Sequence, residues 1–336
     1  MFFKLSSVLL GLLSLANAGA IRRSTLSRTS PPAGCVVVNA SPSSGHFTTV
    51  QAAVNSLSST ATASQCIFIY PGTYKEQVYI PARTAQLTIY GYTTNTSSYH
   101  SNTVTITQGR SQDDQPSNDL TATLRAWNVG LQVYNINLEN TRGAGRQALA
   151  VSAEADKQGF YGVGFMGYQD TILANKGNQI YAKCYIDGAV DFIFGLNARA
   201  WFSRADIRIK GQGFVTASGR DSASNPSYFV IDQSDIRAIN KTVKAGSTYL
   251  GRPWRNYARV VVQNTYMTDV VNSAGWTIWT TGTPNTDHVF FREFGNTGAG
   301  AQGTRAAFSG KLTEPVTIEA VLGSNYASWV DTTYLK

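Results

Sequence analysis

Short apolar runs separated by turn-forming residues occupy most of the chain. The runs are rich in β-branched and aromatic residues, and Gly, Asn, Thr or Ser breaks the chain between them. Many short strands with frequent turn signals predict an all-β fold. The clearest runs lie at residues 66–70, 87–90, 104–106 and 133–138.

One stretch near the N-terminus has a different period. Thr48 and Thr49 are available as caps for a helix that follows them. The stretch therefore predicts a single amphipathic helix. Its apolar positions, which recur at helical spacing, are Phe47, Val50, Val54 and Leu57.

A repeated unit distinguishes a solenoid from a sandwich. Four segments each begin with an aromatic residue followed by alternating small and apolar positions, and they start 27, 20 and 20 residues apart. Steps of this length are typical of coils in a solenoid. The segments begin at Tyr134, Tyr161, Tyr181 and Trp201.

Polar residues in the same region repeat more regularly. Gln147, Gln169 and Asp191 are separated by 22 and 22 residues. If one coil takes about 22 residues there, these side chains stack on neighbouring parallel strands about 4.8 Å apart. We therefore predict an all-β fold, a parallel β-helix whose first coil is capped by the short N-terminal helix.

The first residues have the pattern of a secretory signal peptide. Lys4 precedes an apolar run at 5–15, and small residues ending at Ala18 follow it. The run is shorter than the ~20 residues of a membrane-spanning helix. We expect a secreted, extracellular protein without a membrane anchor. Its expected parts are a signal peptide over 1–18, a short pro-segment ending at Arg22-Arg23 or a disordered N-terminus over 19–30, and a single catalytic domain over 31–336.

The chain is basic, and it stays basic after export. Removing Lys4, Arg22 and Arg23 lowers the formal charge from +8 to +5. A basic exported protein suits a polyanionic partner. The Lys and Arg residues are scattered, without the runs that follow a nucleic-acid backbone. An acidic polysaccharide is therefore the expected partner, bound by a monomer.

The three cysteines allow one disulfide. Cys35 opens Cys-Val-Val-Val and Cys66 opens Cys-Ile-Phe-Ile, so both thiols lie at matching strand starts. We predict a Cys35–Cys66 disulfide and a free Cys184; the alternative is two ordinary buried cysteines. Glycosylation sequons begin at Asn39, Asn95 and Asn240.

Two carboxyl groups and two amides are predicted to share one small patch. Asp191 lies in the apolar segment Gly188-Ala-Val-Asp-Phe-Ile-Phe-Gly195. A carboxylate in such a place is costly unless it is paired, so it is usually an ion-paired or a catalytic group. Asp170 directly follows Gln169 in the preceding coil, and Gln147 lies one coil earlier. Amide donors beside paired carboxylates suit acyl transfer through a carboxylate nucleophile.

Four constrained segments resemble the signature blocks of the pectin methylesterase family, in its fungal and bacterial branch. The resemblance runs from about Val36 to the C-terminus, and it implies a right-handed parallel β-helix with methyl-esterified pectin as the substrate. The segments, together with Gln147-Ala-Leu-Ala, are Gly72-Thr-Tyr-Lys-Glu76, Gly167-Tyr-Gln-Asp-Thr171, Gly188-Ala-Val-Asp-Phe-Ile-Phe-Gly195 and Leu250-Gly-Arg-Pro-Trp254.

The resemblance also implies catalytic roles for residues in these segments. Asp191 is the expected nucleophile and Asp170 the acid/base. Gln147 and Gln169 are the expected oxyanion donors, and Arg252 is expected to hold the nucleophile. Two carboxyl groups about 5 Å apart cannot both ionise cheaply, so Arg252 should lower the pKa of Asp191 and leave Asp170 protonated.

Aromatic residues near these segments are candidates for stacking on sugar rings. Trp254 is the strongest of them, and Phe194, Tyr168 and Trp279 are others. The predicted substrate-binding residues are Trp254, Phe194, Tyr168 and Val190.

Other enzyme classes fit the sequence less well. There is no Gly-x-Ser-x-Gly elbow, and the three histidines lie outside the motifs, which disfavours a serine esterase. No metal and no cofactor are expected, because there is no His/Cys/Asp cluster. Arg208-Ile-Lys210 resembles a polygalacturonase motif, but the aspartate pairs and Gly-His-Gly expected with it are absent. A pectate lyase would need a calcium cluster of acids, and a non-catalytic wall-binding solenoid would not need to bury Asp191 near Arg252.

Overall fold

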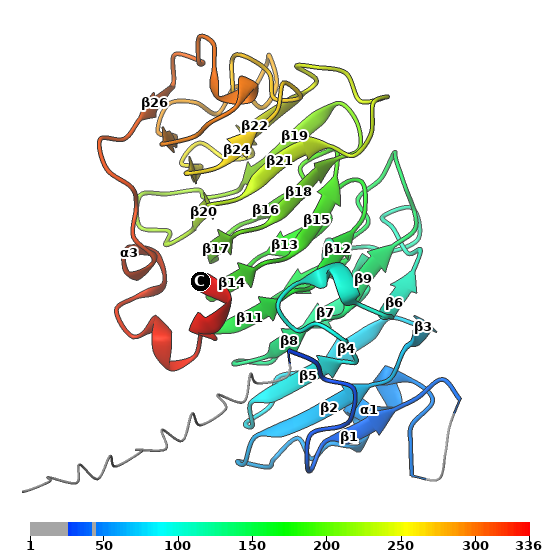
Figure 1. Cartoon of the computed structure of the whole chain (residues 1–336). Coiled ribbons are helices and arrows are strands. Elements are labelled where there is room, and N and C mark those ends of the chain that lie inside the picture. The colour runs from blue at the N-terminus through cyan, green and yellow to red at the C-terminus, as the bar shows by residue number, and fades with distance from the viewer. Residues whose placement is uncertain (1–25, 42–44) are drawn as a thin grey trace, which may run out of the picture.

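The computed structural model describes residues 26–41 and 45–336, and the predicted signal peptide lies outside them. Within the described residues the chain winds through three parallel sheets, and successive strands of each sheet are contributed by successive coils. The coils stack from the blue N-terminal end to the orange C-terminal end in Figure 1. The predicted parallel β-helix is confirmed.

Sheet 1 runs the full height of the stack. Its strands are β1 (Val36–Val38), β2 (Gln65–Ile69), β5 (Leu87–Gly91), β8 (Gln132–Tyr134), β11 (Gln158–Tyr161), β14 (Asn178–Ala182), β17 (Arg199–Ser203), β20 (Tyr228–Asp232), β23 (Arg259–Gln263), β25 (Phe290–Phe294) and β26 (Ser309–Lys311).

Sheets 2 and 3 complete each coil. Sheet 2 holds β4 (Val78–Ile80), β7 (Leu124–Ala126), β10 (Val151–Ala153), β13 (Ile172–Ala174), β16 (Ile193–Gly195), β19 (Gly213–Ser218) and β22 (Thr248–Pro253). Sheet 3 holds β3 (Gly72–Lys75), β6 (Val104–Gln108), β9 (Asn137–Asn140), β12 (Gly164–Met166), β15 (Tyr185–Gly188), β18 (Asp206–Ile209), β21 (Asp235–Ala238) and β24 (Tyr266–Met267).

Short helices lie outside the sheets. They are α1 (Val50–Ser56), α2 (Asn118–Thr121) and α3 (Ile318–Leu322), with 3₁₀ turns η1 (Tyr99–Ser101), η2 (Ala299–Ala301), η3 (Tyr326–Ser328) and η4 (Thr332–Leu335). No helix in the described part of the chain is long and apolar enough to cross a membrane.

Helix α1 covers the first coil, as predicted. The Thr49 hydroxyl oxygen accepts a hydrogen bond from the Ala52 N–H at 3.2 Å and so acts as the N-cap. The Glu76 carboxylate accepts from the N–H groups of Val50 and Gln51 at 2.8 and 2.9 Å. A carboxylate at a helix N-terminus satisfies unpaired N–H groups and complements the helix dipole.

The coil length in the central region is 21 residues, which corrects the predicted aromatic repeat. Phe160 pairs with Tyr181, and Tyr181 pairs with Phe202. These three rings stack at centroid distances of 4.9 and 4.5 Å. Tyr161 stacks on Tyr134 instead, at 4.7 Å. The predicted step of 20 residues from Tyr161 to Tyr181 is one residue shorter than the coil. Side chains alternate between the two faces of a strand, so these two rings face opposite sides of the sheet and do not form one column.

The predicted strand at 133–138 is divided into β8 and β9. Asn135 lies between them with a φ of 52°, which bends the chain from sheet 1 into sheet 3. Asn is among the residues that tolerate this left-handed conformation most easily. The same bend recurs in later coils at Lys183, Arg204, Gln233 and Asn264, each with a positive φ.

Arg28, which precedes the predicted domain start at residue 31, contacts the β-helix. Arg28 pairs with Thr93 through two backbone hydrogen bonds of 2.9 and 3.0 Å. Its guanidinium also lies 4.6 Å from the ring centre of Tyr90 and 5.4 Å from that of Tyr134. Arg28 therefore packs on sheet 1, and the predicted cut after Arg23 lies outside the described residues.

All three cysteines lie in the described part of the chain. Cys35 and Cys66 form a disulfide with a Cα–Cα distance of 4.6 Å. The register pairs Val36 with Ile67, so the two cysteines face each other at the starts of β1 and β2. The predicted disulfide between matching strand starts is confirmed. Cys184 is buried and forms no disulfide.

Candidate active site

The candidate residues lie on the outer side of sheet 2 and in the loops that lead into it from sheet 3. Gln169 forms a parallel bridge with Val190, and the Asp170 N–H donates to the Val190 carbonyl at 3.0 Å. Asp170 and Asp191 therefore occupy equivalent positions in successive coils. The predicted column of Gln147, Gln169 and Asp191 is wrong, because a spacing of 22 shifts each residue by one position in coils of 21.

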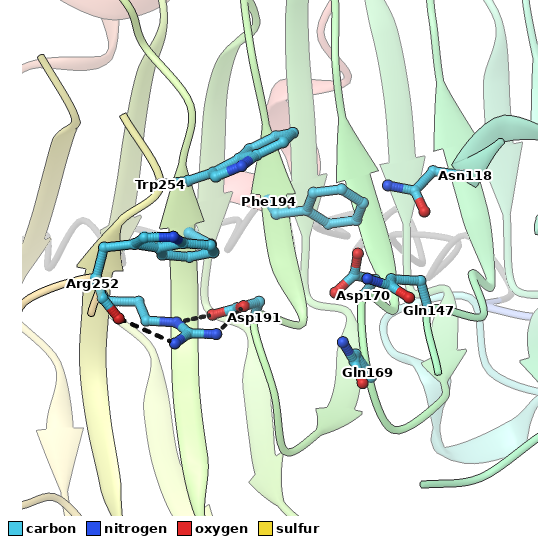
Figure 2. Close-up of a pocket in the computed structure, with 10 residues that line it drawn as sticks. Asn118, Gln147, Gln169, Asp170, Asp191, Phe194, Arg252 and Trp254 are labelled. Atoms are coloured by element: carbon cyan, nitrogen blue, oxygen red, sulfur yellow. Dashed lines mark hydrogen bonds and ion pairs between the residues drawn. The ribbon is translucent and has the colours of Figure 1, made fainter. Parts of the chain in front are cut away.

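These residues nevertheless meet around one cavity of about 190 Å³ (Figure 2). The cavity includes every predicted catalytic residue and two of the predicted substrate-binding residues, Phe194 and Trp254. Its lining residues are Asn118, Gln147, Gln169, Asp170, Asp191, Phe194, Ala217, Arg252, Trp254 and Trp279.

The two aspartates share an uncommon backbone conformation. Asp170 has a φ of 64° and Asp191 a φ of 50°. Each side chain leaves the chain at a sharp turn just before a strand of sheet 2, and each residue is only 6% exposed. The same conformation bends the chain between sheets 1 and 3, and Asp is among the residues that tolerate it best.

Arg252 binds the Asp191 carboxylate with two hydrogen bonds (Figure 2). Its Nε donates to Oδ1 at 2.9 Å and its Nη2 donates to Oδ2 at 2.7 Å. The guanidinium lies between the rings of Phe214 and Trp279, 4.0 and 4.1 Å from their centres. A bidentate, stacked arginine is held in both position and orientation.

The register of sheet 2 explains how Arg252 reaches Asp191. Phe194, Ala217 and Arg252 form one outward-facing row on β16, β19 and β22. Ala217 is the small member of this row. We infer that its short side chain leaves room for the arginine to lean across β19 toward Asp191.

Burial and charge separate the two carboxyl groups. Burial raises the pKa of Asp170 well above its usual value, the negative charge of Asp191 raises it further, and Arg252 opposes both effects. Burial also raises the pKa of Asp191, and Arg252 lowers it in part. The predicted lowering by Arg252 is thus present, but burial outweighs it. The arrangement still favours the proton on Asp170 and the charge on Asp191.

Two side-chain amides face the same carboxyl groups. Figure 2 shows the amides of Gln147 and Gln169 beside Asp170. Among the described residues, neither side chain forms a hydrogen bond with another protein group. Their positions are set through the backbone, because the Gln169 carbonyl accepts from the Ala148 N–H at 3.2 Å. Both amides are therefore available to a ligand.

Sequence reasoning missed Asn118. It begins α2, and its side-chain oxygen accepts a hydrogen bond from Gln112 at 2.6 Å, which leaves its NH₂ group available to the cavity. Asn118 lies in a polar loop without a motif, so only the folded structure brings it to the site. Tyr168 and Val190 do not line the cavity, and their predicted roles stay predictions.

Comparison with known proteins identifies the family. A family model described as Pectinesterase matches residues 36–320. The chain belongs to the pectinesterase family. It is 54% identical to a pectinesterase of Aspergillus aculeatus, over 94% of this chain and 96% of that protein. It is 52% identical to a pectinesterase of Aspergillus niger, over 92% and 95% of the two chains.

Solved structures of pectin methylesterases share the fold. The deglycosylated Aspergillus niger enzyme is 41% identical with a TM-score of 0.86, and the match covers 92% of this chain and all of that one. The carrot enzyme is 30% identical with a TM-score of 0.80, over 90% and 97% of the two chains. The predicted family and enzyme class are confirmed: this is a pectinesterase of the fungal branch.

Proposed function

We propose that this pectinesterase converts methyl-esterified pectin to pectate and methanol through a covalent intermediate on Asp191. The observation that carries the proposal is the pair of buried aspartates in one cavity. Arg252 binds one of them and thereby favours its charged form, while burial and the neighbouring charge raise the pKa of the other well above its usual value. A carboxylate nucleophile beside a carboxylic acid can split ester hydrolysis into two easier steps.

In the first step the Asp191 carboxylate attacks the ester carbonyl carbon. A bond forms between an Asp191 oxygen and that carbon, and the carbonyl oxygen becomes negatively charged. The amides of Gln147 and Gln169 are placed to donate hydrogen bonds to this oxygen, each worth roughly 3 kcal/mol of barrier. The bond to the methoxy group then breaks, and Asp170 gives its proton to that oxygen, which releases methanol.

In the second step water hydrolyses the anhydride. Asp170, now ionised, takes a proton from a water molecule, and the water oxygen attacks the former ester carbon. The bond to Asp191 breaks, which restores its carboxylate and the salt bridge with Arg252, while Asp170 holds a proton again. The product is the free carboxyl group of one galacturonate unit.

Aromatic residues of the cavity supply a surface for the sugar chain. The Phe194 and Trp254 rings lie 6.1 Å apart, and both border the space above the two aspartates in Figure 2. Flat apolar rings suit the apolar faces of pyranose sugars. Tyr168 and Val190 remain proposed substrate contacts outside this cavity.

The test replaces each aspartate by its amide. Asp191→Asn and Asp170→Asn should each reduce methanol release from esterified pectin by more than about a thousandfold, because an amide can neither attack nor donate an acidic proton. Circular dichroism should show the β-helix intact. Activity retained by folded Asp191→Asn protein would refute the mechanism, and new reducing ends or unsaturated products would indicate a polygalacturonase or a lyase.

We further propose that the enzyme is secreted and acts as a monomer on pectin, without nucleic-acid or membrane partners. The Cys35–Cys66 disulfide supports passage through an oxidising compartment. N-terminal sequencing of the exported protein should find a start after Ala18, or after Arg23 if a pro-segment is removed. Retention of residue 1 in the exported protein would contradict the signal peptide.

A further inference from the structure

Asp187 is a buried carboxylate that the proposed reaction does not use. It lies in β15, is 4% exposed, and is not part of the cavity lining. Burial raises the pKa of this carboxyl group, and the positive charge of Lys210 opposes the effect. A carboxylate is costly to bury, so its hydrogen bonds show what the fold gains from it.

Asp187 holds both ends of one short segment, one end through its carboxylate and the other through its backbone carbonyl. The Gly167 N–H donates to Asp187 Oδ1 at 2.9 Å, and the Thr171 hydroxyl donates to the Asp187 backbone carbonyl at 2.9 Å. Lys210 Nζ donates to the same Oδ1 at 3.2 Å and to the Gly167 carbonyl at 2.9 Å. The Tyr185 hydroxyl donates to the remaining carboxylate oxygen at 3.2 Å.

The segment between these ends, residues 167–171, carries Gln169 and Asp170. Gly167 is packed so closely that an added Cβ would lie 2.6 Å from the Thr171 hydroxyl oxygen. The left-handed conformation of Asp170 needs support from its surroundings, because an L-residue rarely adopts it freely. Asp187 and Lys210 come from the next two coils, on β15 and directly after β18, so they tie the segment to the coil that carries Asp191.

We propose that Asp187 and Lys210 are positioning residues, which hold residues 167–171 in the geometry that directs Gln169 and Asp170 at the ester. The inference rests on the proposed function. It also gives a role to Lys210, the last residue of Arg208-Ile-Lys210, which resembles a polygalacturonase motif but had no assigned function. Arg208, two residues earlier, bonds to Asp206 and Asp235 and makes no contact with the segment.

Three variants test the proposal. Lys210→Met removes the positive charge but keeps most of the length of the side chain. Asp187→Asn keeps the shape of the side chain but removes its negative charge, which weakens the hydrogen bonds with Gly167 and Lys210. Each should lower kcat about 10- to 100-fold with KM changed less than about threefold, because a displaced catalytic group slows the chemical step more than it weakens binding. Arg208→Met breaks ion pairs on the same strand and is the matched control, with kcat near that of the wild type.

A second measurement does not depend on activity. Hydrogen exchange followed by mass spectrometry should show faster exchange of peptides covering 167–171 in Lys210→Met and Asp187→Asn, but not in Arg208→Met. Lys210→Arg, which keeps a cation, should recover most of kcat. Wild-type kcat and wild-type exchange in Lys210→Met would overturn the positioning role, as would an equal loss of kcat in Arg208→Met. Failure of the wild type to release methanol would instead refute the proposed function, while the exchange result still decides this inference.

Discussion

Asp170 and Asp191 are the same residue type in equivalent positions of successive coils, and their neighbours make them different. Both carboxyl groups are buried, which raises both pKa values. Of these two carboxyl groups, Arg252 hydrogen-bonds only that of Asp191; its third hydrogen bond goes to the Trp279 backbone carbonyl. The negative charge thereby fixed on Asp191 makes a second charge on Asp170 more costly. One arginine therefore assigns both roles, and the two groups titrate as a coupled pair.

Replacing this arginine should change the pH dependence as well as the rate. In Arg252→Ala the Asp191 carboxylate loses the interaction that lowers its pKa, so that pKa rises further. Since Asp191 must be ionised to attack, the acidic limb of the profile of kcat against pH should move to higher pH. The measurement is initial-rate methanol release at saturating pectin.

Arg255→Ala is the control for this experiment. Arg255 is a neighbouring arginine beside Trp254 that has no hydrogen bond with either aspartate in the described structure. Its acidic limb should stay where it is in the wild type. If Arg252→Ala lowers only the height of the profile and leaves its acidic limb unmoved, Arg252 binds substrate and does not tune Asp191.

The candidate catalytic residues could be found from the sequence because they lie in motifs. A carboxylate surrounded by Val190, Phe192 and Ile193 has an unusual context even without a structure. Asn118 has no such context, since an asparagine in a polar loop is ordinary. The net direction of the Asp191 pKa shift also needed the structure, because burial and Arg252 act in opposite directions and only their geometry decides the balance.

At the scale of elements, the spacing of motifs was a poor measure of coil length. The 22-residue intervals joined residues at different positions of their coils, whereas hydrogen-bonded register gives 21. The helix at 50–56 was predictable, because the spacing of its apolar residues and its N-cap Thr49 are both local features of the sequence. The segment Gly72-Thr-Tyr-Lys-Glu76 contributes no residue to the cavity lining, and its Glu76 instead binds the start of α1.

This contact predicts a structural role for Glu76. Glu76→Ala leaves the N–H groups of Val50 and Gln51 without their acceptor and should lower the free energy of unfolding by about 1 kcal/mol, as for loss of a helix cap. Thermal or denaturant unfolding measures the change, and kcat should stay at the wild-type value. A fall in kcat without a loss of stability would assign this motif to the reaction.

At the scale of the whole molecule, the two ends of the described chain meet on the outer face of sheet 1. The C-terminal segment, red in Figure 1, returns beside β11 and β14. There the Tyr334 ring lies 5.1 Å from that of Tyr161 and 5.9 Å from that of Tyr134. Arg28 reaches the same group of rings from the N-terminal side. No sequence pattern predicts this contact, because Arg28 and Tyr334 are about 300 positions apart and neither residue lies in a periodic run.

Arg28 and Tyr334 should therefore stabilise the fold cooperatively. Burial lowers the pKa of Arg28 and raises that of Tyr334, and the direct interaction between the two side chains opposes both shifts. Both side chains also pack on Tyr134. Residues that share a partner show coupling of about 0.5–3 kcal/mol in a double-mutant cycle. We expect Arg28→Ala and Tyr334→Ala to destabilise the protein together by less than the sum of their separate effects, because the first replacement already removes part of what the second can remove.

Denaturant unfolding of the two single variants and the double variant measures this difference. The control cycle pairs Tyr334→Ala with Glu76→Ala at the first coil, where the effects should add within about 0.5 kcal/mol. Additive effects of Arg28→Ala and Tyr334→Ala would mean that the two ends pack on sheet 1 independently.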